Sequence, residues 1–444
     1  MNNIEINTPC GKIRGLELDN HIQYRGIKYA DAKRWRYPTE IKSWDGVYDA
    51  TQYGACCFQR RAFEPDESCN PFYSKEFRKN AKFTYSEDCQ FLNIWAPKNA
   101  EGCPVLIYIH GGSFTGGSTD EKHISGEKYA ENGVIFVAMN YRLGPYGFCS
   151  HPDLTDKNGR CGNFGLYDQL TAISWVRNNI SAFGGDSQKI TLLGQSAGAM
   201  SVDILVSSKR CKNWFSGAVF MSGAGIQRAV ARPLAAEKTR AFWDAIIENA
   251  GVSTIQELRA VDEKTLYYAW FDACKADKKS MLYTLPVNDF DLVDKDEFNM
   301  KKLPDIPYII GVTATDMVPA AMEWLTKKYA AVAMKNKSGC YVYNFDRLLP
   351  GDKSGAWHSC DLLYAFGTLL NNWRPYEKID YEISHQMIKS ISAFCKNGNP
   401  DCNAIPKWEK GAARPLHFCE NTKSAPWHTA DMIKSTFSKA GAEF

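Results

Sequence analysis

The sequence lacks the short motifs that mark common metal sites. It contains no Cys-x-x-Cys pair and no His-Glu-x-x-His motif, so the ligand spacing of zinc ribbons and zinc proteases is absent. It also contains no stretch close to the roughly 20 apolar residues that a membrane-spanning helix needs. We therefore expect no metal, no other cofactor and no membrane span.

Long runs of one charge are missing as well. The net charge is +3 over 444 residues, and the lysines and arginines are scattered along the chain. Proteins that bind nucleic acids or anionic membranes usually carry a clustered basic patch. The pattern disfavours both partners and leaves a small molecule as the expected ligand, while the oligomeric state stays open.

The first fifteen residues, MNNIEINTPCGKIRG, contain no apolar segment of the kind found in secretion signals. The chain has fifteen cysteines, an odd number that in a secreted protein would suggest a disulfide framework. Without a signal, reduced thiols are the simpler expectation. We therefore predict a cytoplasmic protein.

Short apolar segments alternate with helical patterns along the chain. Those rich in β-branched or aromatic residues resemble strands buried on both faces of a parallel sheet; they are residues 105–109, 134–140, 189–194, 217–223, 306–312 and 340–345. Residues 165–180 lie between two of them and carry apolar side chains at helical spacing. The alternation predicts an α/β fold with a mostly parallel central sheet and helices on both faces.

Residues 226–304 depart from this alternation. The segment AAEKTRAFWDAIIENAG predicts an amphipathic helix that ends at Gly251, and no strong strand precedes Ile306. Neither border of the region is rich in proline, glycine or serine, as a linker between domains would be. We therefore predict a single domain over residues 1–444, in which 226–304 is a helical insertion that covers the site.

A G-x-S-x-G pattern, GQSAG, places Ser196 between a predicted strand and a predicted helix. Five residues alone also fit an ordinary turn or a helix-capping serine. In a strand–turn–helix setting, however, the strained turn holds the serine hydroxyl out at the carboxyl end of the sheet. The setting predicts that Ser196 is a nucleophile.

A nucleophilic serine needs hydrogen-bond donors for the oxyanion that forms during attack. The segment IHGGSFTGGS, residues 109–118, follows the predicted strand 105–109 directly. A glycine-rich loop in this position can turn its N–H groups towards the serine. The alternative is a flexible turn without a role in catalysis.

Four histidines follow Ser196 and could act as its base. His358 stands in a loop between a strand and a helix, His385 lies within a helical pattern, and His417 and His428 belong to an irregular tail. Asp316 follows the strand 306–312, where it could orient the histidine or simply cap the next helix. The order serine, acid, histidine favours Ser196, Asp316 and His358 as a triad.

Several ordered segments resemble the type-B carboxylesterases, the α/β-hydrolase family that includes the cholinesterases. The resemblance is nearly full length and rests on YRGIKYA, SEDCQFLNIWAP, NYRLGPYGF, GNFGLYDQ, FGGD, GQSAGA, GAWHSCDL and the late segment WRPYEKID…FCKNGNP. It implies an α/β-hydrolase fold and the triad already inferred from the residues, with aspartate at position 316 where glutamate is commoner. The stretch between the acid and the histidine is short, which suggests a compact, bacterial member with an open site.

The resemblance also implies roles for residues near the serine. The oxyanion donors would be the N–H groups of Gly112, Ser113 and Ala197, with Ser113 standing where the family usually has a third glycine. Apart from the resemblance, Phe114 and Trp357 flank the motifs and are expected to bind substrate, with a place in the core as the alternative in a chain that is 13% aromatic. Gln195 replaces the commoner glutamate before the nucleophile.

Family members often link the cysteine of the SEDC motif, here Cys89, to an upstream cysteine. Cys56, Cys57 and Cys69 are available, although reduced thiols are expected in a cytoplasm.

The expected activity is hydrolysis of carboxylic esters through an acyl-enzyme. The same residues could act on amides, carbamates, acyl-sugar esters or phenolic esters. A non-catalytic binding protein, of the kind that this family also contains, is the remaining alternative.

Overall fold

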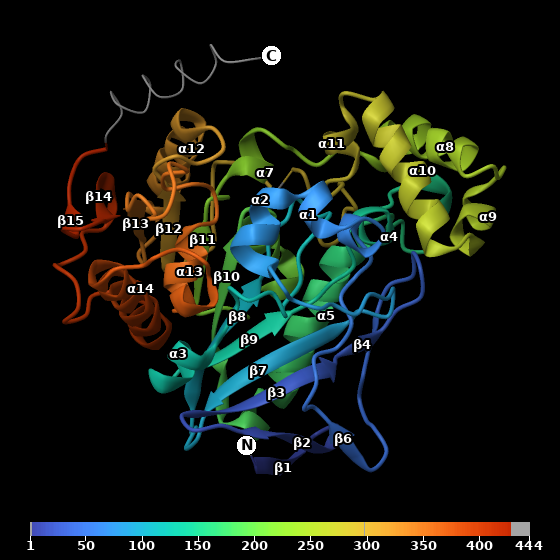
Figure 1. The fold of residues 1–444 in the computed structure, drawn as a ribbon. Coiled ribbons are helices and arrows are strands. Elements are labelled where there is room, and N and C mark those ends of the chain that lie inside the picture. The colour runs from blue at the N-terminus through green and yellow to red at the C-terminus, as the bar shows by residue number, and fades with distance from the viewer. Residues whose placement is uncertain (1, 297, 428–444) are drawn as a thin grey trace.

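The computed structural model describes residues 2–296 and 298–427. Its described strands form one large sheet and one short pair, β4–β5 (Figure 1). The strands are β1 Asn2–Thr8, β2 Gly11–Glu17, β3 His21–Lys28, β4 Ala30–Asp31, β5 Thr39–Glu40, β6 Val47–Asp49, β7 Phe91–Pro97, β8 Cys103–Ile109, β9 Ile135–Met139, β10 Gly185–Gln195, β11 Gly217–Met221, β12 Tyr308–Thr313, β13 Cys340–Phe345, β14 Gly411–Phe418 and β15 Lys423–Ser424.

The central part of the large sheet is parallel. Its order is β1-β2-β3-β7-β9-β8-β10-β11-β12-β13-β14-β15, and within the stretch from β9 to β14 each strand is parallel to the next. The six strands expected from the sequence correspond to β8 to β13 and occupy this centre. The N-terminal strands β1, β2, β3 and β7, which the apolar runs did not reveal, add an antiparallel flank.

Helices cover both faces of the sheet. They are α1 Asp66–Cys69, α2 Pro71–Tyr73, α3 Glu127–Glu131, α4 Gly144–Gly147, α5 Phe164–Asn179, α6 Ala197–Ser207, α7 Ile226–Ala229, α8 Arg240–Asn249, α9 Ile255–Ala260, α10 Glu263–Ala276, α11 Ser280–Tyr283, α12 Pro319–Ala333, α13 Asp361–Ala365 and α14 Lys378–Asn397. A π-helical turn, η2, spans Ser74–Arg78.

The alternation of side chains along each strand divides the core into two layers. In β8, Ile107 and Ile109 pack with apolar residues of α5 and α6, whereas Leu106 and Tyr108 pack with those of α13 and α14. Successive residues of a strand point to opposite faces, so each run of buried apolar residues feeds both layers. A continuous apolar run is therefore what these strands require.

Residues 226–304 contain the helices α7 to α11 between β11 and β12, and α8 to α10 form a group at one end of the molecule (Figure 1). Trp243 of α8 and Leu266 of α10 are fully buried and belong to the same apolar core as α5 and α6. The insertion thus shares the core of the sheet.

The fifteen cysteines all lie in the described part of the chain, and none of them forms a disulfide. Cys89 is buried against the thiol of Cys57, and the disulfide that the family resemblance implied for Cys89 is not formed.

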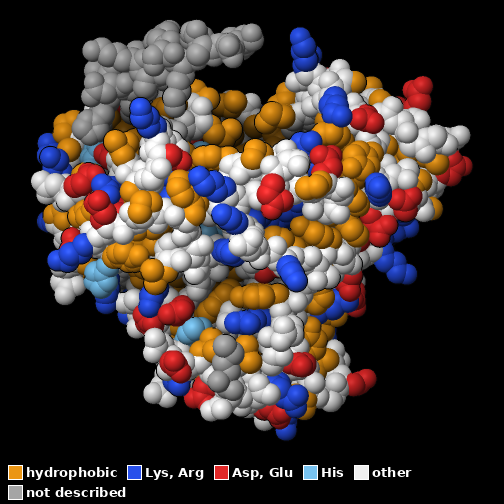
Figure 2. All heavy atoms as spheres, viewed as in Figure 1, with side chains coloured by type: hydrophobic (Ala, Val, Ile, Leu, Met, Phe, Trp, Pro, Cys, Tyr) orange, Lys and Arg blue, Asp and Glu red, His pale blue; other side chains and the backbone are white. Residues whose placement is uncertain are grey.

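Charges of both signs are interspersed over the face of the molecule drawn in Figure 2. No helix in the described residues has the length and apolar content needed to cross a bilayer.

Candidate active site

Ser196 stands at the sharp turn between β10 and α6. Its backbone has φ 54° and ψ −123°, a conformation that non-glycine residues rarely adopt. A Cβ atom on Gly194 would lie 2.3 Å from the carbonyl oxygen of Gly198, and one on Gly198 would lie 2.0 Å from that of Ile109. The two glycines are required because the turn brings backbone against backbone, and the serine is held out at the carboxyl end of β10.

His358 and Asp316 lie together at the same edge of the sheet. Nδ1 of His358 is 2.6 Å from Oδ1 of Asp316, which follows β12, while His358 stands in the loop before α13. Asp316 is buried and its Oδ1 also accepts from the backbone N–H of Met317 at 2.8 Å. The N-cap position of α12 is held by Val318, so the carboxylate of Asp316 is directed at the histidine instead of capping that helix.

Gln195 contacts the other ring nitrogen of His358. The Nε2 atoms of the two side chains are 3.1 Å apart. Within the residues that the structure describes, the hydroxyl of Ser196 makes no hydrogen bond, although Ser196 and His358 line one cavity. Hydrogen bonds of catalytic groups often tighten only when substrate binds.

Two buried carboxyl groups near His358 have opposite pKa shifts. Burial raises the pKa of Asp316, but the hydrogen bond and the charge of His358 outweigh it and hold that pKa below its usual value. Burial raises the pKa of Asp361, at the start of α13, to about 6, although Tyr343 donates a hydrogen bond to it at 2.8 Å. Asp316 is thus kept ionised, and Asp361 is the weaker acid of the two.

The glycine loop after β8 lies against the serine. A Cβ atom on Gly111 would be 3.1 Å from Cβ of Ser196. Gly112 and Ser113 have φ values of 108° and 55°, and their N–H groups donate to no acceptor among the described residues. Ala197 is the first residue of α6, where an N–H has no partner within the helix. The N–H groups of Gly112, Ser113 and Ala197 are thus without a partner among the described residues, in two segments that lie next to each other at Ser196.

Residues that the sequence reasoning missed support the glycine loop. Tyr141 donates from its hydroxyl to the carbonyl oxygen of His110 at 2.8 Å, and the N–H of Gly144 donates to that of Phe114 at 2.7 Å. Gln59 bonds to both the N–H and the carbonyl of Gly117. The segment NYRLGPYGF, which contains Tyr141 and Gly144, was recognised only as a family motif.

A buried ion pair joins two further motifs behind the loop. Arg142 of NYRLGPYGF donates two hydrogen bonds of 2.7 Å to Asp168 of GNFGLYDQ, and both side chains are fully buried. Removing one partner of such an ion pair strongly destabilises the folded protein, because the other charge is then buried without a counter-charge.

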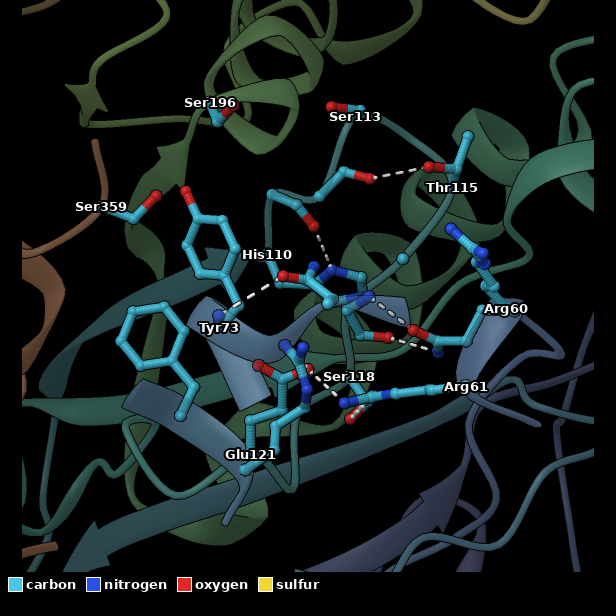
Figure 3. A pocket seen from close by; sticks show the side chains of 18 of the residues that line it. Arg60, Arg61, Tyr73, His110, Ser113, Thr115, Ser118, Glu121, Ser196 and Ser359 are labelled. Atoms are coloured by element: carbon cyan, nitrogen blue, oxygen red, sulfur yellow. Dashed lines mark hydrogen bonds and ion pairs between the residues drawn. The ribbon is translucent and has the colours of Figure 1, made fainter. Parts of the chain in front are cut away.

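The edge of the sheet at which Ser196 and His358 lie opens into a cavity of about 570 Å³. Its wall includes Ser196, His358, Gly112 and Ser113, together with residues from η1 (Arg60–Ala62), α1, α2, η2 and α10. Figure 3 shows Ser196 and Ser113 at one end of this view, His110 near its middle, and Glu121 and Arg61 at the other end.

The structure corrects the two predicted substrate-binding residues. Phe114 is fully buried and packs against Phe148, with ring centroids 4.8 Å apart. Trp357 is buried behind Tyr73 and Phe77, which are the residues that reach the cavity. Neither Phe114 nor Trp357 lines the cavity, because their places in the loops turn the rings towards the core.

The other candidate histidines lie elsewhere. His385 is exposed on α14, and His417 of β14 is paired with Asp346. His428 lies outside the described residues.

Comparison with known proteins identifies the family. The model of the carboxylesterase family matches residues 2–330 and 320–431. The chain belongs to this family. It is a carboxylic-ester hydrolase with the α/β-hydrolase fold, as the resemblance in the sequence predicted.

Among carboxylesterases, the para-nitrobenzyl esterase of Bacillus subtilis (strain 168) is 29% identical over 90% of this chain and 91% of its own length. The mouse bile salt-activated lipase is 33% identical over 69% of this chain, which spans 50% of the lipase. A solved thermophilic pNB esterase superposes with a TM-score of 0.81 at 25% identity, covering 98% of this chain and 99% of its own.

Proposed function

We propose that Ser196, His358 and Asp316 form the catalytic triad of this esterase. The observation that carries the proposal is the 2.6 Å contact between His358 and Asp316 at the cavity that Ser196 also lines. Asp316 would hold the imidazole with its proton on Nδ1 and stabilise the imidazolium that forms during the reaction.

The chemical steps follow from this arrangement. Ser196 attacks the ester carbonyl while its proton passes to Nε2 of His358. The hydrogen bond from the side-chain amide of Gln195 to this nitrogen must break first. The oxyanion is bound by the N–H groups of Gly112, Ser113 and Ala197. The alcohol leaves with the proton from His358. A water molecule, deprotonated by the same nitrogen, then attacks the acyl-enzyme, and His358 returns that proton to the oxygen of Ser196 as the carboxylic acid leaves.

Small alkyl and aryl esters are the proposed substrates. The para-nitrobenzyl esterase that spans nearly the whole chain supports this class. The machinery would also suit amides, carbamates, acyl-sugar esters or phenolic esters. A non-catalytic role is disfavoured because all three triad positions hold competent residues.

The proposal extends to the setting of the enzyme. A cytoplasmic location is supported by the fifteen unpaired cysteines, and esterase activity found mainly outside the cells of the source would oppose it. A single domain over 1–444 with an insertion at 226–304 is supported by the shared core. Two separate thermal unfolding transitions would argue against a single domain.

A fluorophosphonate probe tests the triad. The wild-type protein should be labelled on Ser196 and should hydrolyse p-nitrophenyl acetate and butyrate. Ser196→Ala should lose both labelling and several orders of magnitude in kcat. Hydrolysis by Ser196→Ala at near wild-type rate would show that another group is the nucleophile.

A further inference from the structure

A group of apolar side chains is exposed at the mouth of the cavity. They belong to Phe72 of α2 and to Met317 and Val318, which stand between Asp316 and α12. Met317 is 68% exposed and Val318 is 53% exposed, although both residue types are usually buried. Single exposed apolar residues are common on protein surfaces, but a group of them beside a cavity marks a binding surface. We term Phe72, Met317 and Val318 the apolar rim.

Met317 joins the rim to the catalytic groups. Its backbone N–H donates to Oδ1 of Asp316 at 2.8 Å, and the same oxygen lies 2.6 Å from Nδ1 of His358. Met317 also lines the cavity that Ser196 and His358 line. A residue that lines the cavity and is still largely exposed reaches from the cavity to the surface. A ligand that rests on Met317 is therefore continuous with the space in which the ester carbonyl must lie.

Phe72 borders the same part of the mouth. Its ring packs edge-on against the ring of Trp357, with 5.0 Å between the centroids, and the next residue, Tyr73, lines the cavity. Trp357 also pairs with Thr315, two residues before Met317, in an isolated β-bridge. Trp357 thus contacts both segments that carry the rim.

A second part of the mouth carries charges. Arg60 of η1 lines the cavity and is exposed, and its guanidinium lies 5.0 Å from the ring centroid of Phe271 on α10. Arg60 is paired with Glu64, and the ammonium group of Lys275 lies 4.2 Å from the same ring. An alkyl chain that left the cavity past these groups would remove charges from water, which is unfavourable. Leaving over the rim carries no such cost.

Tyr73 extends the apolar surface from the rim towards the serine. It lines the cavity, and Figure 3 shows it at the same end of the view as Ser196 and Ser359. Its hydroxyl donates to the carbonyl oxygen of His358 at 3.3 Å, so the face of the ring is left for an apolar ligand. An uncharged alkyl chain attached to the ester fits this border, and the flexible side chain of Met317 can adapt to it.

We propose that the apolar rim is a subsite for the far end of a long alkyl chain of the ester, which leaves the cavity over Tyr73 and Met317. The first carbons of the chain lie inside the cavity. The later carbons lie on the rim and keep their other side in water. This inference rests on the proposed function of Ser196 and extends its substrates from small esters to esters with one long alkyl chain.

Two series of monomeric esters test the rim. One lengthens the acyl chain of p-nitrophenyl esters from the acetate to the dodecanoate, and the other lengthens the alcohol of n-alkyl acetates from ethyl to dodecyl. All substrates are kept below the concentration at which they form micelles. In one of the two series, kcat/KM should rise about twofold with each methylene that lies on the rim, because full burial of a methylene contributes about fourfold and the rim covers one side of the chain.

Isosteric variants locate the effect. Met317→Gln and Val318→Thr keep the size of each side chain and replace an apolar group with a polar one. Both positions are exposed, so the variants bury no polar group and should fold. In the double variant, kcat/KM should no longer rise with chain length at the rim. The control Met334→Gln changes an exposed methionine at the other end of α12 and should leave the rise as it is in the wild-type protein.

The rise is measured within each protein, so it does not depend on the total activity of a variant. A flat profile of the wild-type protein in both series overturns the rim, while hydrolysis of the short esters stands. A rise that persists in the double variant also overturns it, because the chain is then bound elsewhere.

Two further outcomes are distinct from these. If long esters are favoured only when their concentration is raised until they form micelles, the rim docks an aggregate and the inference of a single-chain subsite is overturned. Absence of turnover in both series, together with no fluorophosphonate labelling of Ser196, overturns the proposed function itself.

Discussion

The side-chain amide of Gln195 contacts the ring nitrogen of His358 that faces away from Asp316, with the two Nε2 atoms 3.1 Å apart. An amide nitrogen can only donate, so Nε2 of His358 is the acceptor and the ring proton is on Nδ1, 2.6 Å from Asp316. This is the tautomer that a general base requires. Gln195 therefore stabilises the reactive form of His358 and competes with Ser196 for it.

Gln195→Glu should change the pH dependence of the enzyme. A carboxylate at this position would favour the protonated imidazolium, which cannot accept the serine proton. The acidic limb of the kcat/KM profile should move to higher pH by about one unit. The control Gln195→Met removes the donated hydrogen bond without adding charge and should move that limb by much less. Identical acidic limbs for the glutamate and methionine variants would exclude an electrostatic role for this position.

Asp316→Asn should lower kcat by about three to four orders of magnitude, since an amide can donate to Nδ1 and stabilise the wrong tautomer. Steady-state kinetics with p-nitrophenyl butyrate measure the loss. Asp316→Glu restores a carboxylate and should recover much of the rate. An Asp316→Asn variant within tenfold of wild type would show that another acid orients His358.

Ser113→Gly should shift acyl preference. Ser113 is exposed at the cavity, and its φ of 55° is a conformation that glycine adopts without strain. Removing the side chain leaves the N–H in place and widens the cavity, so kcat/KM for p-nitrophenyl octanoate should rise severalfold relative to the acetate. Ser113→Thr should lower this ratio. The same ratio in all three proteins would mean that acyl chains do not pass Ser113.

Asp361→Asn should stabilise the protein at alkaline pH. Burial raises the pKa of Asp361 from 3.8 to about 6, so the folded state favours its protonated form. The stability from that proton is fully present below the unfolded pKa and is lost as the pH rises through about 6. An asparagine is never charged and keeps the bond from Tyr343, so the gain should be about 2 to 3 kcal/mol at pH 8.

Urea unfolding at pH 4 and pH 8 measures this gain, which should nearly vanish at pH 4. The control Asp45→Asn, at an exposed position, should change neither value. Equal effects of Asp361→Asn at both pH values would show that the carboxyl does not titrate between them.

The sequence determined much of the fold because the central strands are buried on both faces and therefore consist of continuous apolar runs. The antiparallel flank of β1 to β3 was not predicted. Strands such as β1 have only one partly covered face, so their apolar residues alternate with polar ones and do not form a continuous run. Ser196 could be predicted from the glycines on either side of it. The turn leaves no room for a Cβ atom at those two positions, so this signal is local in the sequence.

The order of a serine, an acid and a histidine, and the glycine loop after its strand, could be predicted from local patterns in the chain. Which side chains line the cavity depends on how distant segments pack, so it became visible only in the folded molecule. The tertiary structure turned Phe114 and Trp357 into the core and brought Arg61, His110 and Glu121 to the cavity. Contacts between segments far apart in the chain determine which side chains of a loop are buried, and the local sequence does not contain those contacts.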